Sequence, residues 1–254
     1  MTITFLGTGT SQGVPVIACE CNVCLSSDHK DKRLRSSVLI EVEGEKLVID
    51  TGPDFRYQML REDVRHLSAV LFTHEHKDHV AGLDDIRAFN FKQQAAIPVY
   101  ASRQVLDALK KEFNYVFSDQ RYPGIPQIHI HEIQNEKFTI LDKIEILPVR
   151  VMHFRLPVMG FRIGDFTYIT DAKTVEPHEI EKIRGTKVLV VNALQREKHI
   201  SHFTLEEAIA FAELIGAEST YFTHISHRLG THEHVAQELP AGIHLAYDGL
   251  KIDC

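Results

Sequence analysis

Residues 73–79 read THEHKDH and directly follow an apolar run. Three histidines and one aspartate fall within six positions, and imidazole with carboxylate suits a hydrolytic transition metal such as zinc, manganese or iron. His74 and His76 alternate on an extended segment, so both side chains can face one ion. Asp78 and His79 follow at the turn into a helix and can face a second ion. The segment therefore predicts a two-metal centre.

The bulk composition limits the classes of protein that the chain can represent. Its 254 residues suffice for a large core, and α/β folds of this length are often one domain. Thirty-five acidic and 28 basic residues give a net charge of −7, which argues against a general binder of nucleic acid or anionic membranes. No apolar segment approaches the roughly 20 residues that span a bilayer, and the N-terminus reads as a first strand instead of a signal peptide. We expect one cytoplasmic domain over residues 1–254, with no membrane partner, and the sequence leaves a homodimer open.

Short β-rich runs alternate with helical patterns along the whole chain. Strands are predicted at residues 3–6, 37–42, 46–50, 69–73, 144–151, 160–163, 166–170, 187–192 and 220–223. Helices are predicted at residues 78–91, 102–114, 177–183 and 204–215. The last helix has a capping box of Thr204 and Glu207. Residues 117–127, with two prolines, are expected to form a loop, and the mixture predicts one compact α/β domain.

Three further candidate ligands each follow a β-rich run: His153, Asp171 and His224. Side chains at strand ends lie in loops that carry chemistry on a rigid scaffold. Taken singly, each is more often a hydrogen-bonded surface residue or a cap. Their interpretation as ligands therefore depends on their occurrence together with residues 73–79.

Residues 74–79 and these three positions, in this order, resemble the complete ligand set of the metallo-β-lactamase superfamily. The resemblance implies an α/β (α+β) fold, a four-layer αββα sandwich of mixed sheets with the metals at one rim. The implied ligands are His74, His76 and His153 for one ion, Asp78, His79 and His224 for the other, and Asp171 as the bridge.

Two divalent ions about 3.5–4 Å apart can share a hydroxide and contact both the attacking and the leaving oxygen of an ester. The ligand types accept zinc or manganese, so the sequence does not choose between them. Asp78 could also orient the hydroxide. Asp50 is interpreted as a hydrogen-bond partner of a ligand histidine, or equally as a turn-forming residue two positions before a glycine.

A separate cluster, Cys19, Cys21 and Cys24, supplies three thiolates within six residues. A closed structural zinc needs four ligands, and a loop of free thiols is the alternative. The loop resembles that of PhnP-like phosphoribosyl cyclic phosphate phosphodiesterases, in which the cysteines and the histidine of a His-x-x-His pair bind a structural zinc. The resemblance implies His227 as the fourth ligand, and such a zinc would hold the nearby His224 in place.

Residues 202–204, His-Phe-Thr, resemble a motif of phosphodiesterases in this superfamily. There the histidine contacts the scissile phosphate or protonates the leaving oxygen, and the helix that starts at Thr204 would add an anion site. We therefore predict Asp78 and His202 as catalytic residues and His202 and Thr204 as phosphate contacts. His202 could instead be a surface residue near a cap, and His199 competes with it but lacks the helix start. No role is assigned to His129, His131, His232 and His234.

The leading hypothesis is a dinuclear metal-dependent phosphodiesterase that hydrolyses a small cyclic ribosyl or nucleotide-like phosphodiester through a metal-bridging hydroxide. A tRNA 3′-processing endonuclease is an alternative, but the chain lacks a basic, glycine-rich arm. A thioester or lactam hydrolase is disfavoured by residues 202–204. A quinone-cofactor-biosynthesis protein of the same fold is a further alternative, although such proteins depart from the full ligand set. The sequence does not identify the substrate.

Overall fold

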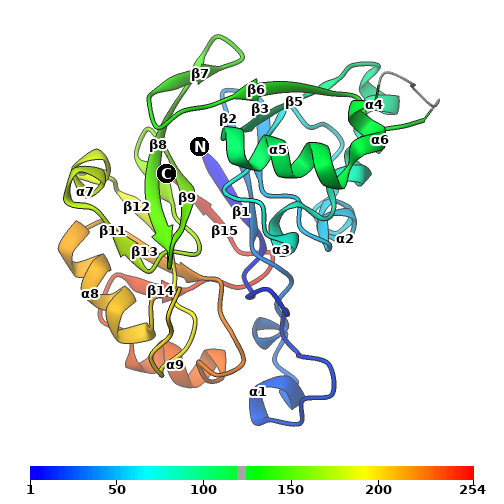
Figure 1. Ribbon diagram of the computed structural model, residues 1–254. Coiled ribbons are helices and arrows are strands. Elements are labelled where there is room, and N and C mark those ends of the chain that lie inside the picture. Colours follow the sequence, from blue (N-terminus) through cyan, green and yellow to red (C-terminus); the bar gives the residue numbers. More distant parts are fainter. Residues whose placement is uncertain (119–123) are drawn as a thin grey trace.

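The computed structural model describes residues 1–118 and 124–254, in which two β-sheets lie face to face between helical layers (Figure 1). The seven-stranded sheet has the order β15 (Lys251–Asp253), β1 (Thr2–Gly7), β2 (Ser37–Val42), β3 (Glu45–Ile49), β4 (Ala69–Leu71), β5 (Ile97–Ala101) and β6 (Ile128–Glu132). The eight-stranded sheet has the order β11 (Thr174–Val175), β8 (Ile144–His153), β9 (Leu156–Ile163), β10 (Phe166–Tyr168), β12 (Val188–Asn192), β13 (Ser219–Thr223) and β14 (Ile243–Leu245), with β7 (Phe138–Ile140) paired to β8. This arrangement confirms the predicted fold class.

Helices cover the outer faces of both sheets. The first sheet carries α2 (Phe55–Arg61), α3 (Lys77–Val80), the 3₁₀ helix η2 (Leu83–Ile86), α4 (Arg87–Gln93), α5 (Arg103–Glu112) and α6 (Asn114–Phe117). The second sheet carries α7 (Pro177–Ile183), α8 (Leu205–Ile215) and α9 (His232–Glu238). A lobe with α1 (Asn22–Leu25) and the 3₁₀ helix η1 (His29–Asp31) extends outside these layers (Figure 1).

Three apolar clusters fill the interfaces between the four layers. In β2, Val38 and Ile40 belong to the core between the sheets, whereas Leu39 belongs to the core under the first helical layer. This division follows from the two-residue period of a strand. Phe55 of α2 and Phe211 of α8 anchor the two helical layers. Both sheets are thus buried on both faces, which leaves their edges and rims for function.

Most of the strands that precede the predicted ligands run parallel to their neighbours. The exception is β8, which ends at His153 and is antiparallel to β9, so that it runs in the same direction as β10. In the first sheet β3, β4 and β5 are parallel, and in the second β10, β12, β13 and β14 are parallel. The carboxyl ends of parallel strands share one edge of a sheet, where ligands commonly bind. This geometry gathers the strand-end side chains at one rim of the sandwich.

All nine predicted strands are present. The predicted helix at residues 78–91 is wrong, because the segment is not one continuous helix. Three short helices, α3, η2 and α4, replace it. The chain turns at Gly82, where a Cβ atom would lie 2.2 Å from the carbonyl oxygen of Gly52. A Cβ on Gly52 would in turn lie 2.2 Å from the carbonyl oxygen of Asp78. The helix is interrupted because two backbones meet there, a contact that apolar periodicity does not reveal.

Other predicted boundaries agree more closely. The capping box of Thr204 and Glu207 at the start of α8 is confirmed, and α7 has its predicted bounds. The list of predicted strands omits six short strands: β5, β6, β7, β11, β14 and β15. Of the predicted loop at residues 117–127, Phe117 ends α6, residues 118 and 124–127 are neither helix nor strand, and residues 119–123 lie outside the described residues.

The described helices do not include one that combines the length and the apolar character needed to cross a membrane. The longest of them, α8, has 11 residues.

Candidate metal centre

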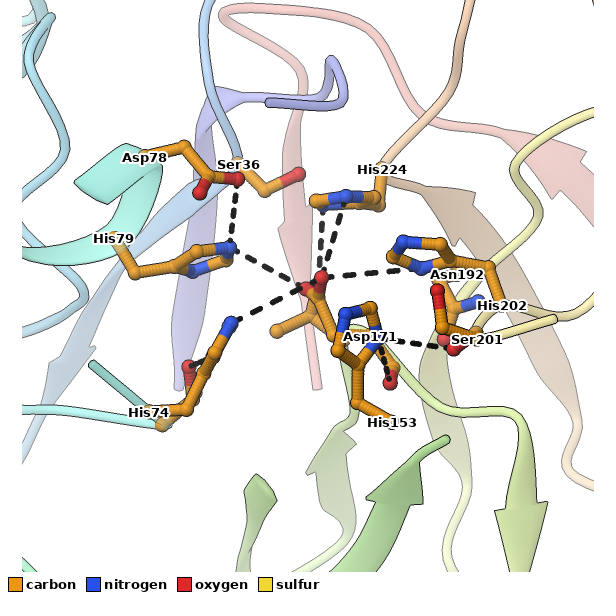
Figure 2. A network of polar contacts seen from close by, with 12 residues as sticks. Ser36, His74, Asp78, His79, His153, Asp171, Asn192, Ser201, His202 and His224 are labelled. Carbon is orange, nitrogen blue, oxygen red and sulfur yellow. Dashed lines mark hydrogen bonds and ion pairs between the residues drawn. The ribbon is translucent and has the colours of Figure 1, made fainter. Parts of the chain in front are cut away.

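The predicted strand-end residues converge on the rim between the two sheets (Figure 2). Two compact groups of donor atoms contain only predicted ligands: His74, His79 and Asp171, and Asp78, His79 and His224. A third group joins His153 and Asp171 to His202. Within each group the donor atoms lie within 4.8 Å of one another.

Asp171 is the centre of this arrangement, and Figure 2 shows the imidazoles around its carboxylate. Its Oδ1 lies 3.4 Å from Nε2 of His224 and 4.0 Å from Nε2 of His74, and its Oδ2 lies 3.3 Å from Nε2 of His79. His79 Nε2 is also 3.1 Å from Oδ2 of Asp78. The carboxylate therefore lies between the two groups of ligands, as a bridging residue must.

These spacings fit metal ions. Four ligands about 2.0–2.1 Å from one tetrahedral ion lie roughly 3.3 Å apart, close to the contacts of His79 and His224 with Asp171. The Nε2 atoms of His74 and His79 are buried and have no hydrogen-bond partner in the described part of the chain. A buried nitrogen without a partner is costly unless something else satisfies it. The donor set therefore fits divalent ions.

A hydrogen-bonded chain behind the cluster fixes which ring nitrogens face it. His79 Nδ1 lies 2.7 Å from Asp50 Oδ2, and the Thr73 hydroxyl donates to the same oxygen at 2.8 Å. His74 Nδ1 lies 2.9 Å from that hydroxyl. Both rings donate from Nδ1, so both present the Nε2 lone pair to the cluster. The contact with His79 agrees with the predicted support by Asp50, whose φ of 65° also makes it a turn residue.

The ligands of the second sheet have equivalent supports. His153 Nδ1 lies 2.9 Å from the carbonyl oxygen of Ser201, and His224 Nδ1 lies 3.4 Å from Oγ1 of Thr170. The amide of Asn192 bonds both backbone groups of Ala172 and so fixes the turn after Asp171. The sequence motifs do not identify Ser201, Thr170 or Asn192, although Thr170 and Asn192 are the last residues of two predicted strands.

Backbone conformation also directs two of the ligands inward. Asp171 and His224 have φ of 58° and 55°, in the left-handed region that few non-glycine residues adopt. Each follows a strand of the second sheet closely. Such conformations persist where the surrounding structure enforces them, often at functional sites.

The charges of the cluster are mutually dependent. Burial alone would raise the pKa of Asp171, but His224, His79 and His74 lower it well below its ordinary value. Burial alone would lower the pKa of His79, but Asp78, Asp171 and Asp50 raise it well above its ordinary value. Burial and the neighbouring His79 lower the pKa of His74. Buried carboxylates and imidazoles in such numbers indicate a site for positive charge.

His76 is placed less closely than the other predicted ligands. Its ring centroid lies 4.6 Å from that of His74 and 5.2 Å from that of His153, yet its nitrogens join none of the compact groups. The side chain is exposed, so a change of rotamer would displace no packed residue. Its role as a ligand stays a prediction.

His202 lies against the ligands, with its ring stacked on His224 at 4.9 Å and its Nδ1 3.8 Å from Asp171 Oδ1. Nδ1 is buried and has no hydrogen-bond partner among the described residues. Burial, more than the neighbouring histidines, lowers the pKa of His202 to about 3, so its ring is neutral near pH 7. His199 lies farther out, with its ring 5.0 Å from that of His202.

Thr204 makes its hydrogen bonds at the start of α8 and not toward the rim. Its hydroxyl accepts the Glu207 N–H at 3.2 Å, and its own N–H donates to the Glu207 carboxylate at 2.9 Å. Leu205 N donates to the Gln195 carbonyl oxygen. These bonds, with Glu207 itself, occupy the predicted anion site. The geometry therefore favours a structural role for Thr204, which fixes the chain after His202.

The cysteine cluster forms a second centre, in the lobe around α1. His227 Nδ1 lies 3.2, 3.5 and 3.5 Å from the Sγ atoms of Cys19, Cys21 and Cys24. Ligands of a tetrahedral zinc with Zn–S near 2.3 Å and Zn–N near 2.0 Å lie roughly 3.5 Å apart. The N–H of Cys24 lowers the pKa of the Cys21 thiol to about 6. The four residues fit a closed zinc site.

Comparisons with known proteins agree with this geometry. The family model of the beta-lactamase superfamily domain matches residues 45–225. A Porphyromonas gingivalis protein called an octanoyltransferase is 41% identical over 254 residues, which are 99% of this chain and 51% of that protein. The chain thus spans about half of that relative's length.

Two solved structures show the same fold over the whole chain. The crystal structure of a new diphosphatase from the PhnP family has a TM-score of 0.93 and 40% identity, covering 100% of this chain and 97% of the other. Zinc-bound PqqB from Methylobacterium extorquens has a TM-score of 0.79 and 22% identity, with 100% of both chains covered, and shows the fold alone. The chain belongs to the metallo-β-lactamase superfamily, and its likeness to the PhnP-family diphosphatase supports a metal-dependent hydrolase.

Proposed function

We propose that the chain is a dinuclear metal-dependent phosphodiesterase that hydrolyses a small cyclic ribosyl or nucleotide-like phosphodiester. The observation that carries this proposal is the convergence of His74, His79 and His224 on the carboxylate of Asp171, with His202 against the same carboxylate. The 40% identity to a PhnP-family diphosphatase supports phosphorus as the electrophile.

The roles of the ligands follow from their positions at the rim. In this proposal one ion is held by His74, His76 and His153, the other by Asp78, His79 and His224, and Asp171 lies between them. Two divalent ions, zinc or manganese, would supply positive charge for the phosphoryl oxygens and an acidified water. Asp50 and Thr73 keep the Nε2 lone pairs of His74 and His79 directed at the ions.

His202 acts on the substrate in this proposal. A neutral imidazole has one N–H donor, and this N–H would bond a phosphoryl oxygen next to the metal ligands. A bound phosphate would raise the pKa of this ring through its negative charge, and the imidazolium formed by uptake of a solvent proton would pass that proton to the leaving oxygen, which would assist departure of a poor leaving group. Thr204 contributes indirectly, because its capping box fixes the backbone that carries His202.

The second metal site is proposed to be structural. Cys19, Cys21, Cys24 and His227 would bind one zinc as a closed Cys₃His site. The core of this lobe has only three buried apolar residues, Val14, Val23 and Cys24. So small a cluster cannot order the loop alone, and a bound ion would supply the missing folding free energy.

The proposal is tested by turnover on a panel of substrates, with zinc and manganese content measured on the same sample. The panel contains linear phosphodiesters, 2′,3′-cyclic nucleotides, a phosphoribosyl cyclic phosphate, an octanoyl thioester and a β-lactam. We expect cleavage of phosphodiesters, with the highest kcat/KM for a cyclic or nucleotide-like compound. Cleavage of the thioester without cleavage of any phosphodiester would overturn the proposal, and this arm also tests acyl chemistry of the kind named in the Porphyromonas relative.

A diphosphatase is the second candidate, because the similar crystal structure is described by that activity. Both reactions attack phosphorus and differ in the leaving group, an alcohol or a phosphate. Adding a nucleoside diphosphate ester to the panel separates them. A kcat/KM that is higher for the diphosphate than for every phosphodiester would favour the diphosphatase.

A further inference from the structure

A cavity of about 310 Å³ is lined by residues of β13, α9, β14 and the segment that leads to β15. Its lining consists of two tyrosines, two histidines and five aliphatic residues. None of these described residues carries a carboxylate, an ammonium or a guanidinium group. The volume is at the lower end of the range of small-molecule sites, and the cavity contains no predicted ligand of either metal site.

His232 provides a fixed donor in this cavity. Its side chain is only 9% exposed, and Nη2 of the buried Arg33 lies 3.3 Å from its Nδ1. A guanidinium can only donate, so Nδ1 accepts and the ring proton is on Nε2. Nε2 has no hydrogen-bond partner in residues 1–118 and 124–254. Burial, followed by the charge of Arg33, lowers the pKa of His232 to about 4 and keeps the ring neutral near pH 7.

Aromatic rings form much of the remaining lining, and their neighbours hold them in place. The ring of Tyr247 meets that of His232 edge-on at 5.7 Å, and the ring of Tyr221 lies 5.1 Å from that of His244. The ammonium of Lys30 lies 4.9 Å from the centroid of Tyr247. The hydroxyls of Tyr221 and Tyr247 also have no hydrogen-bond partner in the described part of the chain. The cavity therefore combines aromatic faces with three donors.

We propose that this cavity binds a nucleobase, as part of a nucleoside or nucleotide, at a site separate from the metal centre. A nucleobase is planar and uncharged, so it can stack on these rings without a charged partner. Its carbonyl and ring-nitrogen acceptors can receive the three donors. An alkyl chain would leave these donors without partners, and an acidic ligand would find no cation in the lining.

The test is a calorimetric titration of the metal-loaded protein with adenosine, guanosine, cytidine and uridine. Nucleosides carry no phosphate for the metal centre, so the result is independent of whether the chain hydrolyses phosphodiesters. We expect saturable binding of at least one nucleoside. Tyr247→Ala should weaken it at least about fivefold, because a stacking ring is lost.

Two further variants make the result specific. Tyr221→Phe removes one hydroxyl and should weaken binding about two- to tenfold without altering the fold. Tyr57→Ala, at a tyrosine of α2 that is 58% exposed and outside the cavity, should bind as the native chain does. The proposal is overturned if no nucleoside binds at millimolar concentration, or if both cavity variants bind as tightly as Tyr57→Ala.

Discussion

The two ligand clusters of this chain are held in opposite ways. At the rim, the ligands sit at the ends of strands that are buried on both faces, and hydrogen bonds to Asp50, Thr170 and Ser201 fix their rings. In the lobe around α1, three of the four candidate ligands lie on a loop whose core has three buried residues, while Ile17 and Leu25 are 96% and 69% exposed. The fourth, His227, comes from the segment that follows β13.

The difference matches the separate roles proposed for the metals. The ends of buried strands organise the rim, so in the proposed function its ions would add chemistry to a site that the fold already forms. The lobe has little apolar burial, so a bound zinc would add folding free energy there. The segment that leads into the lobe also contacts the rim. Thr10 Oγ1 lies 3.3 Å from His224 Nε2, and His227 is three residues from His224.

The largest effect is expected from Asp171→Asn. The amide keeps the volume but removes the charge shared by the two ion sites, so turnover should fall below detection. The fold should persist, since the rim does not need its ions, and the zinc of the lobe should remain. Metal analysis and circular dichroism on the same sample check both points. Loss of the folded state would show that the rim, like the lobe, needs its ions to fold.

His202→Asn should lower kcat by about 10²- to 10⁴-fold on a phosphodiester with a poor leaving group. With p-nitrophenol as the leaving group, which departs without a proton, the loss should be much smaller. Metal content should not change. Equal losses on both substrates would exclude proton transfer to the leaving oxygen and leave His202 with a binding role.

Asp50→Asn tests the organisation of the rim. The amide cannot accept all three bonds from His79 and Thr73 that the carboxylate accepts. We expect the metal dissociation constant of the rim to rise about 10- to 100-fold, the usual effect of removing a partner behind a metal ligand. Turnover measured against added metal checks this. Unchanged affinity would mean that the strand ends alone position His79.

Cys21→Ser should have the smallest effect on turnover and a local effect on structure. We expect a loss of about one zinc per chain, as a closed four-ligand site requires. Hydrogen exchange should rise in residues 14–26 but not in the sheets, with only a partial loss of kcat, because Thr10 and Thr170 still contact His224. Cys254→Ser, at a cysteine outside the cluster, is the matched control. Full zinc content and full turnover in Cys21→Ser would contradict a structural zinc.

The sequence predicts much of this site because strand-end ligands can be recognised locally. His74, Asp171 and His224 each follow an apolar β-rich run, and such runs end at one rim once the strands are parallel. The residues that hold these ligands in place cannot be recognised from such local sequence patterns. Asn192 and Ser201 act through backbone groups of segments distant in the sequence, so their amide and carbonyl bonds exist only in the folded chain.

The fold shows the same division between local and tertiary information. The capping box of Thr204 and Glu207 spans only four consecutive residues, and α8 starts where that motif predicts. The break at Gly82 depends on Gly52, thirty residues away, and no local pattern contains it. At Thr204 one local pattern supports two predictions that compete, because the hydroxyl that caps α8 is the group predicted to contact the phosphate.

The most direct test of the contrast between the two clusters is anomalous X-ray diffraction at the zinc and manganese absorption edges. We expect two peaks beside Asp171, within bonding distance of His74, His79 and His224. We expect a third peak, at the zinc edge only, among Cys19, Cys21, Cys24 and His227. A single rim ion, or an ordered cysteine cluster without zinc, would contradict this expectation.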